Sequence, residues 1–136
     1  MLHLEIITPD RIAYTDEVDM VVVPSSLGRL GILPKHIPLF ALLVEGELKI
    51  KKNKEDYYLS IGGGFIEVTK SKVTILVTRA VHAKELNEQE IIRAKNEAQT
   101  ALKQKLAPEN MKILQASLRQ SIVDLRLLQK RKHHVH

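Results

Sequence analysis

The sequence predicts an α+β fold, with an N-terminal antiparallel β-sandwich over residues 1–84 and a C-terminal antiparallel two-helix hairpin over residues 85–136. All six glycines and all five aromatic residues lie at or before Phe65, and a single proline, Pro108, follows. Short apolar segments separated by turn residues fill the first part, whereas apolar residues recur at helical spacing in the second. The 136 residues, 44% hydrophobic and 27% charged, are typical of a globular chain.

Eight strands are expected in the first part. Leu2, Leu4 and Ile6 alternate with polar neighbours, which is the period of a half-buried strand. Glu45-Gly46-Glu47 between two apolar segments indicates a hairpin. Strands without intervening helices favour an antiparallel sandwich or a flattened barrel. The expected strands cover residues 2–6, 12–15, 18–23, 39–44, 48–52, 57–61, 65–69 and 73–77.

Two helices are expected in the second part. Asn87 is a good N-cap, and Glu90 occupies the third helical position of a capping box. Pro108 ends the first helix and begins the second, because proline is accepted at the first helical position. The first apolar stripe contains three alanines and buries little area, so we expect a hairpin that is released at low cost. The stripes are Ile91, Ala94, Ala98, Ala101 and Leu102, then Met111, Leu114, Leu118, Ser121, Ile122, Leu125 and Leu128.

Composition excludes several classes of function. The chain has no cysteine, which excludes disulfides, thiolate metal sites and cysteine nucleophiles. It has no apolar run long enough to span a bilayer, and its start resembles no signal peptide. Residues 103–136 contain eight basic and two acidic side chains. Such a basic tail suits nucleic acid, a lipid surface or an acidic protein, and charge alone does not choose among them.

Motifs that could suggest catalysis have simpler explanations. Gly62-Gly63-Gly64 joins strand to strand, whereas a phosphate loop leads into a helix, so a structural role is expected. Ser25, Ser26 and His36 lack a nucleophile elbow and an orienting third group. His133, His134 and His136 could bind metal but form a terminal tract. The basic run over residues 49–54 lacks aromatic neighbours for stacking on nucleic acid, and it suits protection of a sheet edge.

Two segments resemble a known family. Gly28–Leu39 reads GRLGILPKHIPL and is similar to the GxxGILPxHxPL loop of the epsilon subunit of bacterial-type rotary ATP synthases. Gly63–Val68 resembles the GGFxEV stretch of the same family, and Arg93-Ala94 opens the helical region in the corresponding place. The similarity extends in order and spacing from Leu2 to Leu128. The resemblance implies a β-sandwich followed by a helical hairpin.

The resemblance also implies a non-catalytic subunit of the central stalk, without catalytic or metal-binding residues and without a required cofactor. Its partners would be the gamma subunit and the c-ring, and the alpha and beta subunits when the hairpin extends and blocks ATP hydrolysis. No nucleic acid is expected. The chain would lie peripherally on the cytoplasmic face of a bacterial membrane, or in an organelle-encoded equivalent. Candidate subunit-interface residues are Gly31, Leu33, Pro34, His36, Gly63 and Phe65.

Some members bind ATP through a motif like [IL]-D-x-x-R-A, for which this chain has Gln89–Ala94. Glu90 replaces the aspartate and is one methylene longer, which disturbs a buried hydrogen-bond geometry. We therefore expect ATP only as a weak regulatory ligand. Arginines hold phosphate bidentately, so the candidate nucleotide-binding residues are Glu90, Arg93, Arg119 and Arg126.

Two alternatives remain open at this stage. A free-standing β-sandwich with a basic helical tail could bind RNA or DNA in a salt-sensitive manner. An esterase would require turnover by the purified chain. Capture of gamma and the c-ring distinguishes the stalk subunit from both.

Overall fold

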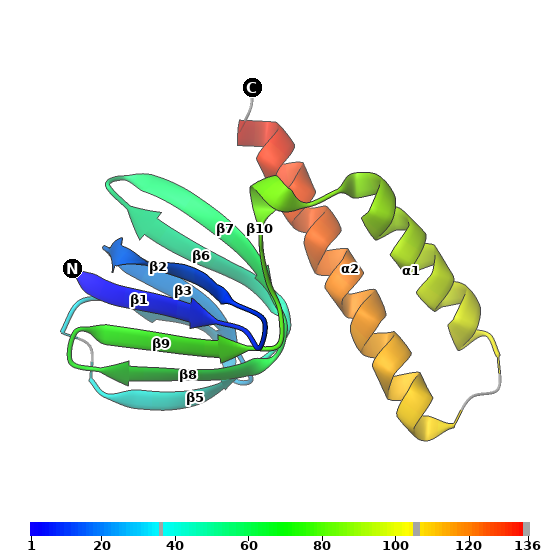
Figure 1. Cartoon of the computed structure of the whole chain (residues 1–136), viewed down its shortest axis with the longest axis horizontal. Helices are drawn as coiled ribbons and strands as arrows, with labels where there is room; N and C mark the ends of the chain where they lie inside the picture. Colours follow the sequence, from blue (N-terminus) through cyan, green and yellow to red (C-terminus); the bar gives the residue numbers. More distant parts are fainter. Residues whose placement is uncertain (36, 105–106, 135–136) are drawn as a thin grey trace. The chain divides into compact units, whose positions relative to one another are not determined.

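The computed structural model describes residues 1–35, 37–104 and 107–134. It divides into two compact units, Met1–His82 and Ala83–His136. The first unit contains all the strands and the second contains all the helices of the described residues (Figure 1).

All eight expected strands are present in the first unit. Two further strands, β4 and β10, were not expected, and both are short. The strands are β1 (Leu2–Ile7), β2 (Ile12–Val18), β3 (Met20–Ser25), β4 (Gly28–Ile32), β5 (Leu39–Leu43), β6 (Gly46–Lys52), β7 (Glu55–Ile61), β8 (Gly64–Thr69), β9 (Lys72–Val77) and β10 (Ala80–His82).

The strands form one hydrogen-bonded path in the order β10-β7-β6-β3-β5-β8-β9-β1-β2, with β4 paired to β3. The β3–β5 step consists of a single pair, Ser25 with Leu43, so the path separates there into two groups. All pairs are antiparallel except β1 with β9, which run parallel. The expected sandwich is confirmed, with this one parallel pair in addition.

Alternate residues of both groups point into one core. In β1, Leu2, Leu4 and Ile6 are fully buried, which is the half-buried pattern that the sequence predicts. Side chains from β6, β7, β8 and β9 meet them in a single hydrophobic cluster. Since one contiguous cluster takes its members from both groups, the sheet folds over on itself. The fully buried large side chains of this unit are Leu2, Leu4, Ile6, Ile32, Leu48, Ile50, Leu59, Ile61, Ile66 and Ile75.

The second unit contains a short 3-10 helix η1 (Ala83–Glu85), α1 (Glu88–Leu102) and α2 (Pro108–His134). The side chain of Asn87 accepts a hydrogen bond from the backbone N–H of Glu90 at 3.2 Å, which confirms the N-cap. Pro108 is the first residue of α2, as expected. The two helices pack side by side (Figure 1).

The buried faces of the two helices only partly match the apolar stripes that the sequence predicts. Ile91 and Ala98 are buried on α1, whereas Ala94 is exposed. On α2, Ser121 and Leu128 of the stripe are buried and Ile122 is 40% exposed. Asp124 and Leu127, which lie outside the predicted stripe, are buried as well. At 100° per residue, Ala94 lies about 60° from Ile91, which places it at the margin of the packed face.

Candidate functional site

A row of apolar side chains crosses the outer face of β5, β8, β9, β1 and β2. In the strand register Leu42 pairs with Phe65, Phe65 with Leu76, Leu76 with Ile7, and Ile7 with Ile12. We call these five residues the apolar row. Four of them are exposed, Leu42 at 53%, Phe65 at 43%, Leu76 at 49% and Ile12 at 64%, and Ile7 is half-buried.

Phe40 widens the apolar row on β5. It is 65% exposed, and its ring stacks on that of Phe65 with centroids 5.5 Å apart. A single exposed apolar residue is normal on a protein surface, but a contiguous group of this kind marks an interaction site. The row lies on the face opposite the core, because side chains of a strand alternate between its two faces.

An open pocket of about 440 Å³ borders the middle of the apolar row. Phe65, Leu76 and Ile7 belong to both the row and the pocket, and Gly63, an expected interface residue, lines it as well. The lining is predominantly apolar, so the pocket suits an apolar side chain of a partner rather than an anion. Its lining residues are Ile7, Thr8, Pro9, Gly63, Gly64, Phe65, Leu76, Val77 and Thr78.

The glycine run 62–64 is shaped by close packing. A Cβ at Gly64 would overlap the carbonyl oxygen of Leu76 and lie 2.8 Å from the Cα of Val77. A Cβ at Gly62 would overlap the hydroxyl of Thr78, whereas at Gly63 it would only touch the Leu43 carbonyl at 3.4 Å. The run connects β7 to β8 and precedes no helix, so its geometry is that of a tight strand connection.

The other expected interface residues lie elsewhere on the sandwich. Gly31 is exposed in β4 and pairs with Val22, and Leu33 and Pro34 are exposed in the connection that follows β4. His36 lies outside the described residues. The structure therefore brings Gly63 and Phe65 together at one end of the strands and places Leu33 and Pro34 at the other.

The candidate nucleotide residues are exposed on both helices. Glu90 and Arg93 lie on α1, and Arg119 and Arg126 on α2. At 100° per residue, both α2 arginines lie roughly 140–160° from buried Ser121. They therefore lie on the exposed side of α2, while Glu90 and Arg93 are exposed on α1.

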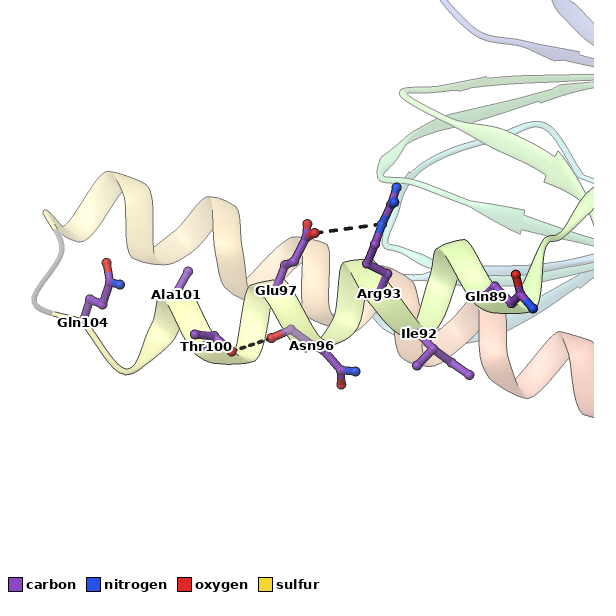
Figure 2. Close-up of a pocket in the computed structure, with 8 residues that line it drawn as sticks. All are labelled: Gln89, Ile92, Arg93, Asn96, Glu97, Thr100, Ala101 and Gln104. Carbon is purple, nitrogen blue, oxygen red and sulfur yellow. Dashed lines mark hydrogen bonds and ion pairs between the residues drawn. The ribbon is translucent and has the colours of Figure 1, made fainter.

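Arg93 instead belongs to a shallow depression of about 640 Å³ along α1, shown in Figure 2. Its guanidinium Nε lies 3.9 Å from the Glu97 carboxylate, and both side chains are about three-quarters exposed. All the lining residues come from α1 except Gln104, which lies two residues beyond its end, so no second element forms an opposing wall. The lining is Gln89, Ile92, Arg93, Asn96, Glu97, Thr100, Ala101 and Gln104.

Charged groups meet at the start of β1 and the end of β2. The ring nitrogens of His3 lie 2.8 Å from the Glu17 carboxylate and 3.3 Å from that of Glu5. These hydrogen bonds, the one to Glu17 first, raise the pKa of His3. Lys52 donates a hydrogen bond to Asp16, and this bond lowers the pKa of the Asp16 carboxyl. Such exposed pairs contribute little to stability because water screens them.

Within the described part of the chain, no group of three histidine, aspartate or glutamate side chains could hold a metal ion. The side chains of His133 and His134 lie outside that part, as does the whole of His136. None of the described helices is long and apolar enough to cross a bilayer.

Comparison with known proteins first defines the class. A sequence model of the family described as ATP synthase, Delta/Epsilon chain, beta-sandwich domain matches residues 1–83. The match covers the unit that contains the apolar row.

Similarity to individual proteins then extends over nearly the whole chain. The ATP synthase epsilon chain of Chloroflexus aggregans is 41% identical over 94% of this chain and 92% of its own length. The epsilon chain of Dehalococcoides mccartyi is 39% identical over 98% of this chain and 96% of its own length. The epsilon chain of Herpetosiphon aurantiacus is 38% identical over 97% of this chain and 97% of its own length. The chain belongs to the ATP synthase epsilon chain family and is thus a subunit of ATP synthase.

Solved structures show the same fold. A chain of the Euglena gracilis mitochondrial ATP synthase OSCP/F1/c-ring structure superposes with a TM-score of 0.68 at 21% identity, covering 99% of this chain and 81% of that one. A chain of the Tetrahymena thermophila mitochondrial ATP synthase central stalk/c-ring structure superposes with a TM-score of 0.61 at 23% identity, covering 96% of this chain and 95% of that one.

Proposed function

We propose that this chain is a non-catalytic subunit of the central stalk, which couples rotation between the c-ring and the catalytic complex and inhibits ATP hydrolysis through its C-terminal helices. The observation that supports a partner-binding role is the apolar row with the pocket that borders it. Four exposed apolar side chains and a stacked phenylalanine lie on the outer face of these strands. The side chains on the other face of the same strands are already buried in the core. Water contact with such a group is unfavourable, and a protein partner relieves it.

We assign the apolar row to the gamma subunit. The test is capture of purified gamma by the full chain with Phe65 and Leu76 both changed to serine. Since a few central apolar residues dominate most interfaces, affinity should fall at least roughly tenfold. Leu27→Ser is the matched control, because Leu27 is 99% exposed and lies in the β3–β4 turn outside the row. Equal capture by the double variant and the control would contradict the assignment.

Inhibition is assigned to the helical unit. The α2 segment is basic, and in an extended state its charges would meet acidic surface on the alpha and beta subunits. Each exposed ion pair contributes only about 0–1 kcal/mol, but several ion pairs together can shift the equilibrium of the helical unit between its folded and extended states. ATP hydrolysis by the assembled catalytic complex should rise when residues 86–136 are deleted, and rise partly with Arg119→Ala plus Arg126→Ala.

Salt and charge reversal sharpen this test. Inhibition should weaken as ionic strength increases, because the Debye length falls to about 8 Å near physiological salt. Changing Arg119 and Arg126 to glutamate should relieve inhibition further than alanine does. If alanine and glutamate variants inhibit as strongly as the parent at low salt, inhibition is steric rather than electrostatic.

ATP is proposed only as a weak regulatory ligand of this unit. The exposure of Glu90, Arg93, Arg119 and Arg126 supports weak binding, since exposed cations gain little from a phosphate in water. Calorimetry with ATP should find no site tighter than about 1 μM, roughly −8 kcal/mol. A submicromolar site that Arg93→Ala abolishes would show that Glu90 in place of aspartate is harmless.

The subunit would act peripherally, on the cytoplasmic face of a bacterial membrane or in the organelle-encoded equivalent. The bacterial relatives support this placement. Separation of membranes from soluble extract, before and after the catalytic complex is stripped from them, tests it.

A further inference from the structure

Three connections of the sandwich gather at one end of its strands. They are the described residues of the β4–β5 connection (33–35 and 37–38), the β6–β7 turn (53–54) and the β8–β9 turn (70–71). Ile32 at the end of β4 pairs with Val21, whose neighbour Met20 pairs with Lys51 next to the β6–β7 turn. Leu39 pairs with Val68 next to the β8–β9 turn, and the pairing of His3 with Lys72 places the start of β1 there as well. We call this part of the surface the lysine end.

Each of the three connections presents an exposed lysine. Lys35, Lys54 and Lys70 have backbone φ values of 63°, 68° and 42°, a left-handed region that non-glycine residues seldom occupy. None of the three forms an ion pair with any other residue that the structure describes. Their ammonium groups are therefore available to an external anion.

The carboxylates near the lysine end are already engaged within the sandwich. Glu17 is bonded to His3, and Asp16 accepts from Lys52. Asp19 accepts from the backbone N–H of Asn53 at 2.9 Å, and Glu55 from the Tyr57 hydroxyl at 2.7 Å. These carboxylates keep their negative charge but lie along the strand ends, while the three lysines occupy the turn tips.

Exposed apolar side chains lie among these lysines. Ile37 is 79% exposed, Leu33 55% and Met1 56%. Leu33 and Ile37 flank Lys35 in one connection, and Met1 precedes β1 at the same end. Apolar residues beside cations are typical of surfaces that rest in the headgroup layer of a bilayer.

We propose that the lysine end binds the anionic phospholipid surface of a membrane, with the three lysines on phosphate headgroups and Leu33 and Ile37 in the interfacial layer. A lysine ammonium is a point charge on a flexible stem, which suits mobile headgroups. The three lysines lie on separate turns, so they match a deformable anionic surface better than one fixed carboxylate pocket. This binding goes beyond the proposed stalk function and does not depend on it.

The test is sedimentation of the full chain with vesicles of mixed phosphatidylglycerol and phosphatidylcholine, and with phosphatidylcholine alone. The chain should bind the anionic vesicles and be released by salt. Changing Lys35, Lys54 and Lys70 to asparagine should weaken binding at least roughly tenfold, and asparagine tolerates the left-handed backbone. Circular dichroism melting verifies that the triple variant stays folded.

The matched control removes three exposed lysines from the helical unit, with Lys84, Lys103 and Lys112 changed to glutamine. This control variant has the same net charge as the triple variant, and it should still bind the anionic vesicles. A loss equal to or greater than that of the triple variant would overturn the proposal and assign lipid binding to the basic helices.

Two further measurements separate the sources of negative charge and the apolar contribution. Ile37→Asn should weaken vesicle binding without changing its salt dependence, because it removes only apolar contact. Polyglutamate should not capture the chain. Capture by polyglutamate that requires the three lysines, without binding to anionic vesicles, would overturn the proposal in favour of an acidic protein.

Discussion

The three consecutive glycines between β7 and β8 provide a graded test of the packing beside the apolar row. Alanine adds one methyl group at each position, and the surroundings of that methyl differ. At Gly64 it meets backbone, the Leu76 carbonyl and the Val77 Cα at 2.8 Å, which move only if the β8–β9 pairing opens. At Gly62 it meets the Thr78 hydroxyl, and at Gly63 only ordinary contact at 3.4 Å.

The expected losses of unfolding free energy follow from these neighbours. Gly64→Ala should cost about 3 kcal/mol or more, since overpacking against rigid backbone costs at least as much as overpacking in a core. Gly62→Ala should cost about 1 kcal/mol, because Thr78 can change rotamer at that cost. Gly63→Ala should lie within about 0.5 kcal/mol of the parent, because alanine also loses less conformational entropy on folding.

Urea unfolding followed by circular dichroism measures all three variants under one set of conditions. Equal losses for Gly64→Ala and Gly63→Ala would refute the reasoning, because the position of the added methyl would then not matter. A loss of gamma capture in Gly63→Ala without a loss of stability would instead assign that glycine to the interface.

Three further predictions concern the helical unit and the charged strand ends. Asn87→Ala should destabilise α1 by about 1 kcal/mol, seen as faster amide exchange in its first turn, while Asn87→Ser should retain most protection. His3 has a raised pKa in the folded chain, so its contribution to stability is full below its ordinary value near 6.5 and is lost as pH rises through the raised value. The thermal midpoint should show a small decline over that window that His3→Gln abolishes, and a decline unchanged in that variant would contradict the assignment to His3. Truncation after Lys84 should leave a folded sandwich that still binds gamma, and loss of β-structure in circular dichroism would contradict separate folding of the two units.

Local patterns in the sequence were sufficient to predict most elements of the fold. The alternation of Leu2, Leu4 and Ile6 and the N-cap at Asn87 depend on neighbours within a few residues, and both predictions are confirmed. β4 has two glycines in five residues and shows no alternation, so it was not expected. β10 is only three residues long and is defined by its pairing with β7, which no local pattern reveals.

The candidate site was predicted less completely because it depends on strand register. Phe65 was predicted as an interface residue from a sequence motif. Its neighbours Leu42 and Leu76 are 23 and 11 residues away in the chain and come next to it only through strand pairing. One local signal was available. Residues 39–44 are apolar without a break, so the outer face of β5 is as apolar as its core face, although an antiparallel strand with one solvated face should alternate.

The parallel pairing of β1 with β9 has a consequence for synthesis. His3 pairs with Lys72, which follows it by 69 residues. The first strand to be synthesised, β1, therefore cannot form this pairing until β9, one of the last strands of its unit, has been made. At ribosomal rates of about 5–20 residues per second, that interval is roughly 3–14 seconds. During this interval the β1–β2 hairpin has an open edge, and an open edge can pair with another nascent chain. The order of the strands thus delays completion of this sandwich until β9 has been synthesised.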